Sequence, residues 1–137
     1  MLFPHGSQAV EPLPDGNQLA RTIRELIPEK NIEIRATMEV IERERKRLKT
    51  GIVIRVEKPG QTEWCTTYEA SRDGKVAELW RVCHELGQAN RYEQKGHLAK
   101  RAEIYSSLAG SSFYIADFGM EFLHWPSQAV LKTQRRK

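Results

Sequence analysis

The stretch that decides the fold is residues 32–57, which read IEIRATMEVIERERKRLKTGIVIRVE. Over residues 32–40, apolar residues alternate with Glu, Arg and Thr. This period of two is typical of a strand with one buried face. A second apolar run, Ile52-Val53-Ile54 with Val56, follows Gly51 and is rich in β-branched residues, which favour strands. The stretch therefore predicts two strands, over 32–41 and from Ile52, with a charged segment between them.

A helix over residues 31–49 is the alternative. Ile34, Met38, Ile41 and Leu48 recur at roughly helical spacing, and the Glu, Arg and Lys content suits a helix. Arg45 interrupts that apolar face. The strand is therefore the preferred interpretation.

Turn chemistry extends the pattern in both directions. Pro59-Gly60 predicts a turn, and residues 64–68 then form the partner strand of a hairpin. Before the first strand, Leu19, Ile23 and Leu26 fall on one face of a helix, which Pro28 ends.

Two further helices and a last strand are expected in the second half. Asp73-Gly74 is interpreted as the entry to a helix with a regular apolar face, made by Val76, Leu79, Trp80, Cys83 and Leu86. Another helix is predicted from about His97 to Leu108, ended by Gly110, and residues 113–118 read as a strand.

These elements predict an α+β fold. Its order is α-β-β-β-α-α-β, with a small antiparallel sheet and helices packed on one face. The length of 137 residues suits one domain. We place that domain at residues 17–126, after a flexible arm at 1–16 that holds three of the six prolines, and before a basic tail at 127–137.

Charge is distributed unevenly along the chain. The net charge is +4, yet residues 43–49 alone carry +4 and residues 132–137 carry another +4. The rest of the chain therefore has a net charge of −4. The sequence describes a slightly acidic body with two basic patches.

The two basic patches predict a non-enzymatic, nucleic-acid-associated or regulatory protein that contacts the phosphate backbone of DNA or RNA. The aromatic residues Trp64, Tyr68 and Tyr114 are expected to stack on bases if their faces are exposed. The proposed nucleic-acid-binding residues are Arg43, Arg45, Lys46, Arg47, Lys49, Lys132, Arg135, Arg136 and Lys137.

The sequence predicts no catalytic residue, cofactor or metal site. Cys83 and His84 are neighbours, but on the predicted helix they point about 100° apart, so they do not form a nucleophile and base. The cysteines and histidines lack the paired spacing of zinc ligands. Asp117-Phe118-Gly119 matches the metal-binding tripeptide of protein kinases, but the other kinase motifs are missing. An enzyme is therefore the less favoured class.

The alternative function is that of a protein–protein adaptor or a homo-oligomeric subunit without nucleic-acid contact. The acidic body and the apolar segment 122–126 favour it. No segment predicts a membrane span or an export signal, so a cytoplasmic location is expected. In that location, Cys65 and Cys83 are expected to be reduced thiols.

Overall fold

A computed structural model describes residues 12–132. Strands take 41% of the described residues and helices 19%, so the fold is mostly β. The first element of the described residues is the helix α1 (Gly16–Arg24), whose first turn is capped by the carboxylate of Asp15. A six-stranded antiparallel sheet follows, in the order of the sequence: β1 (Ile32–Ile41), β2 (Arg47–Glu57), β3 (Glu63–Arg72), β4 (Lys75–Glu85), β5 (Arg91–Gln94) and β6 (His97–Leu98).

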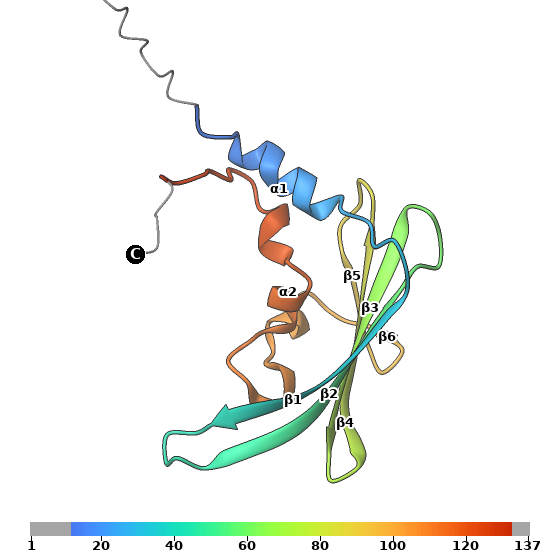
Figure 1. Ribbon diagram of the computed structural model, residues 1–137, viewed down its shortest axis with the longest axis vertical. Coiled ribbons are helices and arrows are strands. Elements are labelled where there is room, and N and C mark those ends of the chain that lie inside the picture. Colours follow the sequence, from blue (N-terminus) through green and yellow to red (C-terminus); the bar gives the residue numbers. More distant parts are fainter. Residues whose placement is uncertain (1–11, 133–137) are drawn as a thin grey trace, which may run out of the picture.

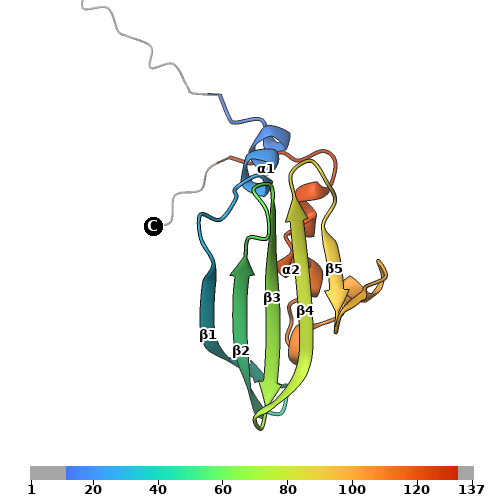
Figure 2. The ribbon, with the colours of Figure 1, turned by 90° about the vertical axis from the view of Figure 1, so that its right-hand side faces the viewer.

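The sheet curves, and the C-terminal segment lies on its concave side (Figure 1). Viewed from the outer side, this segment lies behind the middle of the sheet, and β1 is at one edge (Figure 2). The segment consists of single turns, namely η1 (Glu103–Tyr105), η2 (Leu108–Gly110), α2 (Ile115–Phe118) and η3 (Glu121–His124).

The core lies between the concave face and this segment. Trp80, Val82 and Tyr92 contribute from the sheet, and Leu108 and Ile115 contribute from the C-terminal turns. Polar contacts hold the same interface. Arg72 donates a hydrogen bond to the Ala109 carbonyl at 2.8 Å, and the Glu78 carboxylate accepts one from the Ala109 amide. The segment is therefore anchored by both apolar packing and charged groups.

The hairpin predicted from residues 32–57 is confirmed, but the predicted α+β fold class is wrong. The two helices expected after residue 73 are absent, so no pair of helices packs on the sheet. Their residues form β4 and the short elements after it. The predicted strand at 113–118 is an isolated bridge at Tyr114 followed by the single turn α2.

Turn chemistry explains the error at β4. Asp73 and Gly74 both have positive φ angles, 53° and 73°, and they link the paired residues Arg72 and Lys75. This is the two-residue turn that matches the twist of a β-hairpin, for which Asp-Gly is a preferred sequence. The residues thus turn one strand back on another instead of starting a helix. Pairing with β3 then outweighs the helical spacing of the apolar residues.

Candidate functional site: a polar cleft and an open sheet edge

The first basic patch lies at the end of the β1–β2 hairpin, but only its first half is in the predicted connecting arm, because β2 begins at Arg47. Residues 42–46 connect β1 to β2, and the hairpin ends at one extremity of the molecule (Figure 1). Arg43, Arg45 and Lys46 are exposed in this connection, and Arg47 and Lys49 are exposed at the start of β2. Arg47 forms an ion pair with Glu39 at 3.3 Å.

Of the second basic patch, the structure describes Lys132 alone. Lys132 is exposed, and Arg135, Arg136 and Lys137 lie outside the described residues, as does the predicted arm up to residue 11. The chain before Lys132 contacts α1, where the backbone N–H of Gln128 donates to the Asn17 side-chain oxygen at 2.9 Å. In Figure 1 this region lies at the opposite end of the molecule from the tip of the β1–β2 hairpin.

The predicted base-stacking surface does not form. Trp64 and Tyr68 are buried, and the Tyr68 hydroxyl donates to the Phe118 carbonyl at 3.3 Å. Burial raises the pKa of Tyr68 to about 12. Tyr114 alone of the three aromatic residues is exposed. Sequence reasoning could not find this outcome, because it depends on which sheet face the C-terminal segment covers.

The prediction of reduced thiols is also wrong. Cys65 and Cys83 are opposite one another on β3 and β4 and form a disulfide. Glu63 lies close to both sulfurs, but sulfurs bonded to each other offer no thiolate for a metal. The Asp117 carboxylate accepts a hydrogen bond from the Tyr114 amide at 2.8 Å, so it caps its own short helix.

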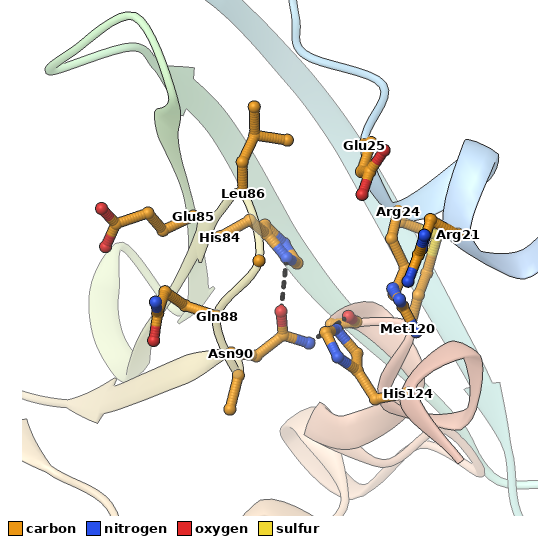
Figure 3. A pocket seen from close by; sticks show the side chains of 13 residues that line it. Arg21, Arg24, Glu25, His84, Glu85, Leu86, Gln88, Asn90, Met120 and His124 are labelled. Carbon is orange, nitrogen blue, oxygen red and sulfur yellow. Dashed lines mark hydrogen bonds between the residues drawn. The ribbon is translucent and has the colours of Figure 1, made fainter. Parts of the chain in front are cut away.

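A polar cleft of about 420 Å³ opens between α1, the end of β4 and η3. Figure 3 shows Arg21 and Arg24 on one side of the space, His84 and Asn90 on the other, and His124 below. In the same view Glu85 and Gln88 point away from the space. The cleft therefore gathers basic and imidazole side chains from three elements that are far apart in the sequence.

A hydrogen-bond network fixes His84 at the wall of the cleft. Nδ1 of His84 is 2.7 Å from Oδ1 of Asn90, and the Asn90 amide nitrogen donates to the Gly119 carbonyl and the Glu121 carboxylate. Both of these groups only accept, so the Asn90 oxygen faces His84 and accepts from it. In neutral His84 the proton is therefore on Nδ1, and Nε2 keeps a lone pair.

Other side chains hold this network in place. The Tyr92 hydroxyl donates to the Glu121 carboxylate at 2.8 Å, and burial together with this bond raises the pKa of Tyr92. The Trp64 ring stacks on the His84 ring with centroids 5.2 Å apart. A side chain at Gly119 would collide with the Tyr92 ring, so glycine permits this close approach. The orientation of His84 is thus set by the core.

Both histidines of the cleft resist protonation. Burial lowers the pKa of His84, and the nearby His124 lowers it further, while Asn90 and Glu121 act in the opposite direction. The pKa of His124 is also lowered, by burial and by Arg24, against the effect of Glu121. Both imidazoles are therefore neutral at neutral pH.

We expect acidification to destabilise the fold. The unfolded chain binds protons on these histidines near their ordinary pKa of 6.5, before the folded chain does. The free energy of unfolding then decreases as the pH falls through this value. Denaturant unfolding at about pH 7.5 and about pH 5.5 measures the loss. His84→Gln is expected to reduce the pH dependence. Equal stability of the unmodified chain at both pH values contradicts this prediction.

The second notable surface is the edge of the sheet. β1 pairs with β2 on one side, and no strand among residues 12–132 pairs with its other side. Its concave-face residues Ile32 and Ile34 are 42% and 49% exposed, and the neighbouring Ile54 and Val56 of β2 are half-buried. The C-terminal segment, which covers the middle of the sheet, leaves this apolar end uncovered.

The pairing geometry shows which backbone groups are free at this edge. The Cα atoms of Cys65 and Cys83 are 4.1 Å apart, the short spacing of an opposed pair without mutual hydrogen bonds. The backbone polar groups of Cys65 therefore point to its partner Glu57 in β2. Because the register continues unshifted to β1, the odd-numbered residues of β1 direct their N–H and C=O groups to the open edge.

Comparisons with known proteins give no relative, since the chain matches no protein family, no curated protein and no solved structure. None of the helices within residues 12–132 has the length and apolar character of a membrane span.

Proposed function

We propose that the chain is a non-enzymatic interaction subunit that associates with another protein strand along β1. The observation that carries this proposal is the open edge of a ten-residue strand with two exposed isoleucines on its concave face. Such an edge accepts a further strand through backbone hydrogen bonds, and the added strand covers the apolar side chains.

A second copy of the chain is a suitable partner because β1 is self-complementary. Antiparallel pairing of two copies centred on Thr37 places Arg35 opposite Glu39 of the other copy, twice over. It also places Ile34 opposite Val40 on the concave side. A pairing centred on Ala36 instead places Glu33 opposite Glu39 of the other copy. A pairing centred on Arg35 places the Arg35 residues of the two copies opposite each other. Because like charges directly opposite are unfavourable, the Thr37-centred register is preferred to these two.

The proposal is tested by sedimentation at increasing protein concentration. The unmodified chain is expected to rise from its monomer mass of 15.8 kDa towards twice that value. Ile34→Lys places a charge among the apolar side chains at the edge, so this variant remains a monomer. Val76→Lys is the matched control, an exposed apolar residue on β4 away from β1, and it associates like the unmodified chain. A monomeric mass for the unmodified chain at every concentration overturns the proposal.

Nucleic-acid binding at the tip of the β1–β2 hairpin is a second candidate. This candidate is supported by the three exposed cations in the connection at that end of the molecule, Arg43, Arg45 and Lys46. None of the three forms an ion pair closer than 4 Å among the described residues. Glu42 and Glu44 in the same turn reduce its net charge, and the candidate base-stacking aromatics of the sheet are buried. Nucleic-acid binding is therefore less favoured than the role of an interaction subunit.

Salt dependence tests this second candidate. DNA and RNA binding is expected to weaken steeply as the salt concentration rises, because bound cations of the nucleic acid are released. Changing Arg43, Arg45, Lys46 and Arg47 to Ala then abolishes binding. No binding at low salt, or equal binding by this variant, removes the candidate and leaves the cations as solvated surface.

The state of the cysteines supports a proposal about the compartment. A cytoplasmic location, expected from the sequence, favours two reduced thiols, whereas the Cys65–Cys83 disulfide favours an oxidising compartment. We propose the oxidising compartment. Alkylation of the protein at the moment of cell lysis is expected to label neither cysteine. Labelling of both cysteines shows that they are reduced thiols and favours the cytoplasm instead.

A further inference from the structure

The cleft beside α1 gathers two guanidinium groups that have no ion-pair partner among residues 12–132. Arg24 donates to the Leu123 carbonyl at 2.8 Å, and neither Arg21 nor Arg24 has an ion pair closer than 4 Å within residues 12–132. The neutral imidazoles of His84 and His124 lie beside them, and Figure 3 shows all four side chains around one space. A bound anion pairs with the two guanidinium groups, which are the charged members of this set.

The acidic groups around the cleft do not neutralise it. Glu121 already accepts hydrogen bonds from Asn90 and Tyr92, and Glu85 points away from the space. Glu25 remains at the α1 side. Glu25 is therefore the carboxylate on the side of the two guanidinium groups, and Glu121 acts on the two imidazoles.

We propose that this cleft binds the phosphate group of a small phosphate monoester. Arg21 and Arg24 are the cations that contact the phosphate oxygens, since guanidinium groups match the geometry of this anion. A cleft of about 420 Å³ exceeds what a bare phosphate fills and leaves space for an organic portion. The site is separate from the proposed docking edge at β1, so either proposal stands without the other.

His84 determines which oxyanion the cleft accepts. It is only 9% exposed, and its Nδ1 is committed to Asn90. Neutral Nε2 therefore needs a donor from the ligand, which a monoprotonated phosphate supplies and a fully ionised sulfate does not. Sulfate binding instead requires protonated imidazoles, so it takes up protons from solution.

Histidine titration by NMR tests the site with inorganic phosphate, glycerol 2-phosphate and sulfate as the probes. Each probe is expected to shift the resonances of His84 and His124, while exposed His97 on β6 is an internal control that does not move. Glycerol 2-phosphate binds more tightly than inorganic phosphate. Sulfate binding strengthens as the pH is lowered from about 7.5 to about 5.5, because it takes up protons on the histidines. Equal shifts at His97, or none at His84 and His124, overturn the proposal.

Paired variants separate the cleft from general charge attraction. Arg21→Gln removes one guanidinium and is expected to weaken glycerol 2-phosphate binding about tenfold or more, the loss typical of a charged hydrogen bond. Arg43→Gln makes the same charge change at the tip of the β1–β2 hairpin and leaves binding unchanged. An equal loss in both variants indicates non-specific attraction and contradicts a built site.

Discussion

Reduction of the Cys65–Cys83 disulfide is expected to lower the free energy of unfolding by about 3 kcal/mol. The two cysteines are 18 residues apart and join neighbouring strands in the middle of the sheet. Breaking the bond restores the chain entropy of that loop to the unfolded state. Denaturant unfolding with and without a reducing agent measures the difference.

A variant without the bond is the control for this measurement. In Cys65→Ala/Cys83→Ala the reducing agent is expected to have no effect, because there is no disulfide left to cleave. If the reducing agent leaves the unmodified chain as stable as before, the disulfide makes no contribution to the fold.

Leu108→Ala is expected to cost about 3 kcal/mol of stability. Leu108 is 1% exposed and packs in the core between the sheet and the C-terminal segment. Its truncation leaves a cavity next to the turn that Arg72 and Glu78 hold through Ala109. Thermal and denaturant unfolding report the loss.

The matched change is Leu98→Ala on β6, where the side chain is exposed. Its expected cost is below about 0.5 kcal/mol, as for other surface substitutions. Comparable losses at Leu98 and Leu108 contradict the placement of the core between the sheet and the C-terminal segment.

The first half of the fold was predictable because its signals are local. Alternation over residues 32–40 and the turn at Pro59-Gly60 correctly predicted β1 and the pairing of β2 with β3. The second half of the fold was not predictable, because apolar residues four positions apart share a face both in a helix and in a strand. Asp73-Gly74 indicated a hairpin turn. Because it was interpreted as the entry to a helix, the residues of β4 were predicted to be helical.

The candidate sites were predictable to different extents. The exposed cations of the β1–β2 hairpin were found from the sequence because charge runs are visible in it. The cleft was missed, since Arg21, His84 and His124 meet only after the C-terminal segment folds back onto α1. The disulfide required knowledge of strand register, which placed Cys65 opposite Cys83.

The most direct test of the proposed β1 association is a charge-reversal mixing experiment with Arg35→Glu and Glu39→Arg. Each variant alone opposes like charges twice across the Thr37-centred pairing, so its self-association weakens about tenfold or more. Mixing the two variants restores opposite charges at both positions. Sedimentation of each variant and of the equimolar mixture is therefore predicted to give two weakly associating samples and one stable heterodimer. Self-association of either variant as strong as that of the unmodified chain, or a monomeric mixture, contradicts the proposed pairing.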